Sequence, residues 1–196
     1  MEKGLTEFQA NVRAGVRGLW TGVFNLDQFI SQMNGAIRRG FTQAWAEGAK
    51  ECGILPDEIT IAEQTKLNSL ISTNLGFVRD FGVAIRRGSK ANGGLLRTQM
   101  TRSGVWVSRY TQVVQEAKAM SCADQKLKWN IDPTKDNCSS CLKLNGKVKR
   151  ASVWEEAGII PQVAGAGYLI CNGYRCGCTL DPTEERGTPG PFPRLP

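Results

Sequence analysis

The chain has 196 residues, and its 25 lysine and arginine residues exceed its 18 aspartate and glutamate residues, which gives a formal net charge of +7. It contains no histidine, which excludes Ser-His-Asp and Cys-His catalysis and any zinc site with an imidazole ligand. With 41% hydrophobic and 22% charged residues, the composition is typical of a globular protein. The positive charge favours an acidic partner, and nucleic acid is the commonest one.

The sequence predicts no membrane segment. Its longest uncharged apolar stretch, residues 157–171, is interrupted by Pro161, Gln162 and glycines, and is shorter than the ~20 residues that a bilayer-spanning helix needs. The first residues lack the basic and apolar regions of a secretory signal. We therefore expect synthesis in a reducing cytoplasm and no membrane partner.

Apolar residues at steps of three and four predict amphipathic helices in the first part of the chain. Four segments show this period: residues 8–19, 26–48, 67–85 and 96–117. Pro56 and the turn around it should end the second helix, and Gly76 should kink the third. Such faces can be buried only against each other, so we expect a helical body over residues 1–120.

The pentapeptide Ala-Ile-Arg-Arg-Gly occurs twice, at residues 36–40 and 84–88. Arginine in a last turn followed by glycine is typical of a helix C-terminus. Alternatively, the four arginines form one basic face toward phosphates.

The densest basic region is interleaved with Trp106 and Tyr110. As a nucleic-acid surface it would combine phosphate contacts with base stacking. The alternative is a solvated face beside two core aromatic residues, because these two residues lie four positions apart on the apolar stripe. The residues predicted to contact nucleic acid are Arg79, Arg86, Arg87, Lys90, Arg97, Arg102 and Arg109.

The composition changes after about residue 119. Five of the seven cysteines fall between residues 138 and 178, so we expect a cysteine-rich lobe over residues 121–182. Residues 183–196 contain four prolines and two glycines, and should form an extended tail suited to lie along a neighbouring subunit.

The cysteines of the lobe form two short pairs and a single residue: Cys138 with Cys141, then Cys171, then Cys176 with Cys178. Two pairs separated by about 30 residues are typical of a four-thiolate tetrahedral zinc site. The predicted ligands are Cys138, Cys141 and Cys176, with either Cys171 or Cys178 as the fourth. The alternatives are a disulfide between the two pairs, reduced thiols in a small core, and a thiol-exchange enzyme using the first pair.

The residues around these cysteines form a recognisable pattern: Lys-Trp at 128–129, Asp136, Cys-Ser-Ser-Cys at 138–141, Leu-Asn-Gly at 144–146 and Arg-Cys-Gly-Cys at 175–178. The pattern resembles that of the phage head morphogenesis family, the Mu F-like minor head proteins. That family usually has His-Pro shortly before the closing cysteines. This chain has Ile170 and Cys171 there, which offers Cys171 as a ligand in place of the histidine.

The resemblance implies a structural minor capsid protein of a tailed bacteriophage, made in the host cytoplasm and located in the virion. It implies a role in head assembly near the portal and in DNA packaging or delivery, with portal and capsid subunits and packaged DNA as partners. We expect no enzyme activity, no catalytic residue and no small-molecule substrate. The alternative is a zinc-ribbon DNA-binding protein outside the virion. The expected fold is mainly α: a helical body of three to four helices with a small cysteine-rich, zinc-stabilised α+β C-terminal lobe.

Overall fold

The computed structural model describes residues 2–122, 125–174 and 176–195. The chain is 59% helix and 6% strand, which confirms the mainly α class. It divides into two compact units, one of residues 1–44 and 64–110, the other of residues 45–63 and 111–196. None of the helices in the described part of the chain has both the length and the apolar character needed to cross a bilayer.

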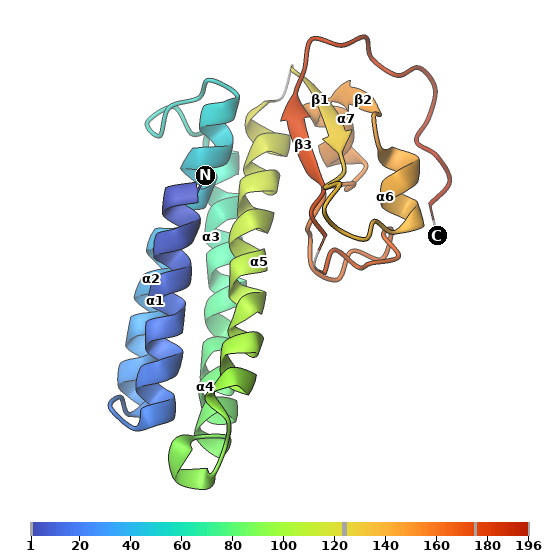
Figure 1. Ribbon diagram of the computed structural model, residues 1–196. Coiled ribbons are helices and arrows are strands. Elements are labelled where there is room, and N and C mark those ends of the chain that lie inside the picture. The colour runs from blue at the N-terminus through green and yellow to red at the C-terminus, as the bar shows by residue number, and fades with distance from the viewer. Residues whose placement is uncertain (1, 123–124, 175, 196) are drawn as a thin grey trace. The chain divides into compact units, whose positions relative to one another are not determined.

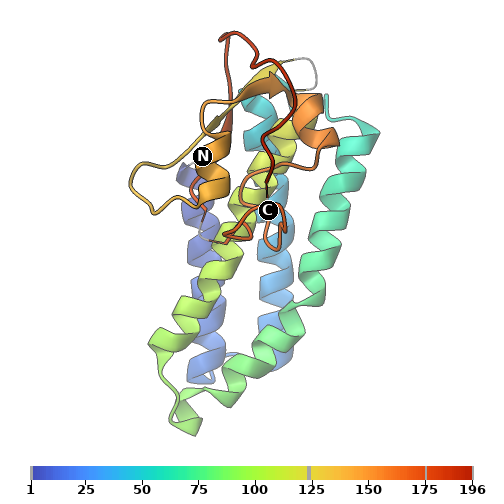
Figure 2. The ribbon, with the colours of Figure 1, turned by 90° about the vertical axis from the view of Figure 1, so that its right-hand side faces the viewer.

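The predicted helices are present, and the kink expected at Gly76 is a break between two helices (Figures 1 and 2). The helical elements of the first part of the chain are α1 (Glu2–Thr21), α2 (Leu26–Glu51), α3 (Ile61–Gly76), α4 (Val78–Arg87), the short 3-10 helix η1 (Lys90–Asn92) and α5 (Leu96–Ser121). α2, α3 and α5 contribute residues to both units.

Reciprocal hydrogen bonds between side chain and backbone mark the starts of α2 and α3. Asn25 accepts a bond from the Gln28 amide at 2.8 Å, and the Gln28 side chain accepts one from the Asn25 amide at 2.9 Å. Thr60 and Glu63 form the same arrangement before α3, at 3.2 and 2.9 Å. Each pair satisfies amide groups that the first helical turn leaves without partners.

Aromatic rings fill the core of the first unit. The ring of Phe8 lies 5.4 Å from that of Tyr110, and the ring of Phe81 lies 5.9 Å from that of Trp106. Trp106 and Tyr110 are 3% and 0% exposed, so both are core residues. The base-stacking part of the predicted nucleic-acid surface is therefore not available from these two rings.

The two copies of the repeated pentapeptide have different surroundings. Residues 84–88 end α4, with Arg86 and Arg87 in its last turn, as expected for a helix C-terminus. Residues 36–40 lie within α2, which continues to Glu51, so this copy ends no helix. A side chain at Gly40 would collide with the ring of Phe8. In this copy the glycine permits close helix packing.

The second unit contains a small antiparallel sheet and two short helices. The strands are β1 (Lys126–Asn130), β2 (Val148–Arg150) and β3 (Thr179–Pro182), in the order β2-β1-β3. Lys128 pairs with Val148, and Trp129 pairs with Leu180. α6 (Ser139–Leu144) and α7 (Ala151–Glu156) precede and follow β2. On the outer edge of β3, the Leu180 amide donates a hydrogen bond of 2.8 Å to the buried side chain of Gln115.

Two indole rings form the centre of this sheet's core. Trp129 and Trp154 are both fully buried, with ring centroids 5.7 Å apart. The Trp154 ring N–H donates to the Leu127 carbonyl oxygen at 3.1 Å, which fixes α7 against β1. Buried Leu144 and Leu180 belong to the same core.

The two units do not coincide with the predicted ranges 1–120 and 121–182. Residues 45–63, from the end of α2 to the start of α3, and residues 111–120, near the end of α5, belong to the same unit as the cysteine-rich lobe. The described tail, residues 183–195, forms no helix or strand, as expected for an extended segment. It leaves β3, passes over the lobe and ends beside α6 (Figure 1).

Candidate metal centre

Three segments of the second unit supply the predicted metal ligands. Cys138 immediately precedes α6 and Cys141 lies in its first turn, so the helical turn brings the two residues together. Cys178 immediately precedes β3, and Cys176 lies two residues before Cys178. Arg175 of the sequence pattern lies outside the described residues.

Cys171 is positioned by a tightly folded loop. The Ile170 amide donates a hydrogen bond of 3.2 Å to the Ser140 hydroxyl, which attaches this loop to α6. Gly173 has a φ of 70°, and a side chain there would collide with the backbone of Val163. Glycine is therefore needed where the loop folds back on itself.

The structure brings all five predicted cysteines into one cluster. The cluster consists of two overlapping groups, Cys138, Cys141 and Cys171, and Cys141, Cys176 and Cys178, and within each group the sulfur atoms lie within 4.8 Å of one another. Cys141 belongs to both groups. Cys141 and Cys178 are 1% and 0% exposed, and the other three are partly exposed.

The distance between two of the sulfurs matches that expected around a tetrahedral metal ion. Four sulfurs that each lie about 2.3 Å from one ion are roughly 3.8 Å apart along each tetrahedral edge. The Cys141 and Cys176 sulfurs are 3.8 Å apart. The cluster therefore has the ligand type and spacing needed to hold a metal ion, and Cys141 is placed to be a ligand whichever residue supplies the fourth sulfur.

The thiols of the cluster influence each other's ionisation. Hydrogen bonds from Cys141 and Cys178 lower the pKa of Cys176, because they stabilise its thiolate. The hydrogen bond with Cys176 raises the pKa of Cys141, and burial adds to that increase. The thiolate form is therefore favoured at Cys176 and disfavoured at Cys141. A bound cation would stabilise the thiolate form of every ligand.

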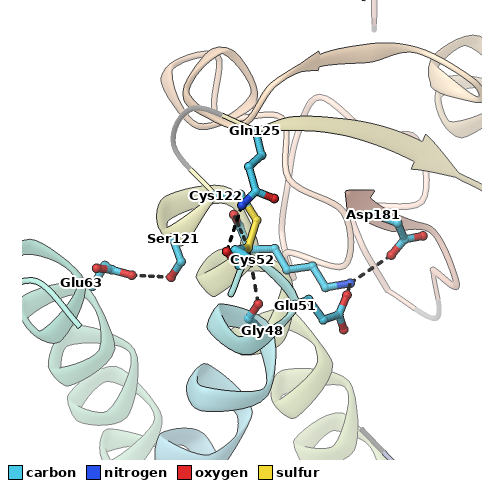
Figure 3. Close-up of a disulfide and its surroundings, with 9 residues drawn as sticks. Gly48, Glu51, Cys52, Glu63, Ser121, Cys122, Gln125 and Asp181 are labelled. Carbon is cyan, nitrogen blue, oxygen red and sulfur yellow. Dashed lines mark hydrogen bonds and ion pairs between the residues drawn. A yellow bond between two sulfur atoms is a disulfide. The ribbon is translucent and has the colours of Figure 1, made fainter. Parts of the chain in front are cut away.

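The predicted alternative of a disulfide between the two pairs is not what the structure contains, because all five cluster cysteines are free. The disulfide instead joins Cys52 and Cys122, whose Cα atoms are 5.1 Å apart and whose positions differ by 70 residues (Figure 3). Sequence reasoning did not pair these residues. The available signal was that each one lies a few residues after the end of a predicted helix.

An ion-pair network around a buried lysine lies close to this disulfide (Figure 3). The Lys118 ammonium contacts the carboxylates of Glu51 and Asp181 at 2.5 and 3.0 Å, although the Lys118 side chain is only 2% exposed. The Gln125 side chain donates to the Cys52 carbonyl oxygen at 2.9 Å. These contacts join the ends of α2 and α5 to β1 and β3, which explains why the ends of α2 and α5 belong to the unit that contains the lobe.

Two carboxylates of this unit have lowered pKa values. Burial raises the pKa of Asp181, but hydrogen bonds from Thr179 and Asn130 and the charge of Lys118 lower it below its usual value. Burial likewise raises the pKa of Glu63, but hydrogen bonds from Ser121 and Thr60 lower it. Both carboxylates are therefore stabilised in their charged form.

The cations predicted to contact nucleic acid lie in the first unit, on α4, η1 and the first half of α5. Arg109 is half-buried, with its guanidinium 5.5 Å from the centre of the Phe77 ring. The remaining six are exposed: Arg79, Arg86, Arg87, Lys90, Arg97 and Arg102. Their contact with phosphates stays a prediction.

No known protein family, characterised protein or solved structure matches this chain. The similarity to the head morphogenesis family therefore depends on the residues of the sequence pattern alone.

Proposed function

We propose that this chain is a structural minor head protein of a tailed bacteriophage, whose C-terminal lobe folds around one zinc ion. The observation that carries the proposal is the convergence of five free thiols, all from the sequence pattern of the lobe, within one small core. The role in the virion is head assembly beside portal and capsid subunits. DNA packaging or delivery is the accompanying role.

The donor set supports zinc as the metal. A tetrahedral set of four sulfurs is typical of zinc or of an iron-sulfur centre. The described lobe has a sheet of three short strands, and such a small core gains folding free energy from a bound metal. Zinc supplies that energy without redox chemistry.

The same donor set supports a structural role for the metal. Four thiolates fill the coordination sphere of zinc, whereas catalytic zinc sites keep one position open for water or substrate. Cys141 and Cys178 are also buried in the hydrophobic core that contains Trp129 and Trp154. A metal held there would link α6 and the segment before β3 as a fixed crosslink.

Two observations support placement in a phage head. The pattern from residue 128 to residue 178 resembles that of the Mu F-like minor head proteins. The chain has a net charge of +7 and exposed arginines on α4 and α5. Contact between these arginines and the phosphates of packaged DNA would release counterions, which favours binding.

Metal analysis tests the proposed lobe. The purified chain should contain one zinc, and Cys138→Ser and Cys141→Ser should each abolish zinc retention. Thiol titration of the native chain should find one cluster cysteine free of metal. A chain that is fully folded with no bound metal contradicts the proposal.

Particle composition tests the proposed location. Mass spectrometry of purified heads from cells carrying the gene should detect the chain in few copies. Recovery of the chain only as a free monomer in the lysate would contradict a role in the virion.

The six exposed cations also favour a second candidate, a DNA-binding protein outside the virion. That function requires measurable duplex affinity that falls steeply with salt, because phosphate contacts release counterions. Arg86→Ala with Arg87→Ala should weaken such binding and reduce its salt dependence. Affinity unaffected by salt would exclude this candidate.

A further inference from the structure

The C-terminal tail is bound to an exposed edge of its own sheet. β2 pairs with β1 on one side only, so its other side has no strand partner within the described sheet. The Thr188 amide donates to the Val148 carbonyl oxygen at 2.8 Å, and the Thr188 hydroxyl accepts from the Val148 amide at 3.0 Å. The tail therefore occupies the position that an added strand would take.

Lysine side chains bind the backbone of the tail. Lys126 donates to the carbonyl oxygens of residues 184 and 185 at 2.9 and 2.8 Å. Lys149 donates to those of residues 188 and 190 at 2.8 and 2.5 Å, and Lys143 donates to that of residue 194 at 3.0 Å. Carbonyls of an extended segment have no partner within it, so these lysines recognise extended backbone whatever its side chains.

The ring of Phe192 fixes which part of the tail lies against the lobe. The Phe192 ring lies 4.8 Å from the ring of Trp154 and 5.7 Å from the Lys149 ammonium. Phe192 and Leu195 are the apolar tail residues that pack against the core of the lobe. The surface formed by Lys143, Val148, Lys149 and Trp154, here called the tail-docking surface, thus recognises an extended segment that carries an aromatic anchor.

We propose that the tail-docking surface binds the tail of a second copy of this chain in exchange for its own, so that copies are linked through swapped tails. A second copy presents the same segment from residue 188 onward and makes the same contacts with Val148, Lys143, Lys149 and Trp154, which is why exchange of an identical element costs little. This proposal depends neither on the metal nor on the location in a phage head.

The connection between β3 and the bound part of the tail is suited to exchange. Arg186 and Gly187 separate the residues held by Lys126 from Thr188; both are exposed, and Gly187 has no side chain that would restrict their path. Within one chain, a short flexible connection gives the tail an effective concentration in the millimolar range at its own tail-docking surface, and a second copy must compete with this. Swapping should therefore become dominant when copies are concentrated to that level, as they are when they neighbour one another in an assembly.

Photo-crosslinking of the full-length chain tests the exchange. Benzoylphenylalanine replaces Phe192, and equal amounts of isotopically heavy and light chains are mixed at about 10 μM and at about 1 mM, below and near the effective concentration of a short linker. Crosslinks between the tail and peptides containing Lys149 or Trp154 are then classified by mass. Sedimentation of the unmodified chain over the same range measures dimer formation.

We expect heavy-to-light crosslinks and dimers to increase at least several-fold between the two concentrations. Phe192→Ala and Thr188→Pro should each abolish dimers, because one removes the aromatic anchor and the other the amide donor to β2. Arg194→Ala is the matched control and should leave dimers unchanged, because residue 194 contacts Lys143 through its backbone. Crosslinks only within one chain at both concentrations, or dimers that persist in both tail variants, would overturn the proposal.

Discussion

The Lys118 ammonium lies 3.0 Å from the Asp181 carboxylate, although the two residues are 63 positions apart in the chain. Lys118 comes from α5 and Asp181 from β3, so this ion pair joins the last long helix to the sheet of the lobe. The second carboxylate on Lys118, from Glu51, extends the connection to the end of α2.

Removal of the Lys118 charge should destabilise the second unit. Lys118→Met leaves two partly exposed carboxylates without their cation, and we expect the free energy of unfolding to fall by about 1–3 kcal/mol, as for a lost hydrogen bond to a charged group. Lys50→Met is the matched control, because Lys50 is exposed in the last turn of α2 and its loss should cost less than about 1 kcal/mol. Urea unfolding of both variants measures the difference, and equal costs would contradict a central role for Lys118.

Acid should weaken the same unit in a predictable direction. The pKa of Asp181 is lowered in the folded state, so its contribution is complete above the unfolded value of about 3.9 and is lost as the pH falls through the folded value. Asp181→Asn should reduce the loss of stability between about pH 5 and pH 2. Part of the loss should remain, because Glu63 contributes with the same sign. Urea unfolding across this pH range is the measurement, and an unchanged pH profile would argue against the assignment to Asp181.

The Cys52–Cys122 disulfide closes a long loop and should contribute strongly to stability. For a sequence separation of 70 residues, the loss of loop-closure entropy in the unfolded chain corresponds to about 4 kcal/mol. The double variant Cys52→Ser with Cys122→Ser should therefore unfold at a temperature lower by roughly 8–16 °C. Substitution is preferable to reduction, because reducing thiols compete for a metal in the cysteine cluster. An unchanged melting temperature in calorimetry would show that the bond is energetically neutral.

Two glycines on the long helices should respond oppositely to alanine. A side chain at Gly48 of α2 would collide with the Val114 carbonyl oxygen and the Ala117 side chain, and we expect Gly48→Ala to cost about 1–3 kcal/mol. Gly104 lies in α5, and a side chain there would meet no atom within 4 Å. Gly104→Ala should stabilise the chain by about 0.5–1 kcal/mol through helix propensity. Thermal unfolding of the two variants should therefore shift in opposite directions.

The overlapping groups in the cysteine cluster predict an unequal response to serine substitution. Cys141 belongs to both groups, so Cys141→Ser should abolish metal retention. Five sulfurs compete for four positions, so at least one of Cys171→Ser and Cys178→Ser should retain a full equivalent of zinc. Metal content after gel filtration measures this, and complete retention by Cys141→Ser would contradict the proposed centre.

The helices and the grouping of the five cysteines could be predicted from sequence because both are local or repeated patterns. The helix faces repeat with the helical period, and two short cysteine pairs already place sulfurs close together. The break after Gly76 was also predictable, since glycine weakens a helix at a known position.

The ion pairs of Lys118 and the Cys52–Cys122 disulfide could not be predicted, because they join residues far apart in sequence. Lysine is rarely buried, so no local pattern placed Lys118 in a core. Cys52 and Cys122 carry no pairing signal beyond their position after helices. The first Ala-Ile-Arg-Arg-Gly copy was ambiguous for the same reason, because only the ring of Phe8 shows that Gly40 serves packing.

The hydrogen bond from the Leu180 amide to Gln115 has a consequence for self-association. Free amides along a sheet edge are a template for aggregation with the strands of other molecules. In the described sheet, a glutamine side chain occupies one such edge at Leu180, and Thr188 occupies the other at Val148, whichever copy supplies it. Because both edges are covered at these positions, the sheet favours closed species, a monomer or a tail-swapped pair, over open-ended addition of strands from other molecules.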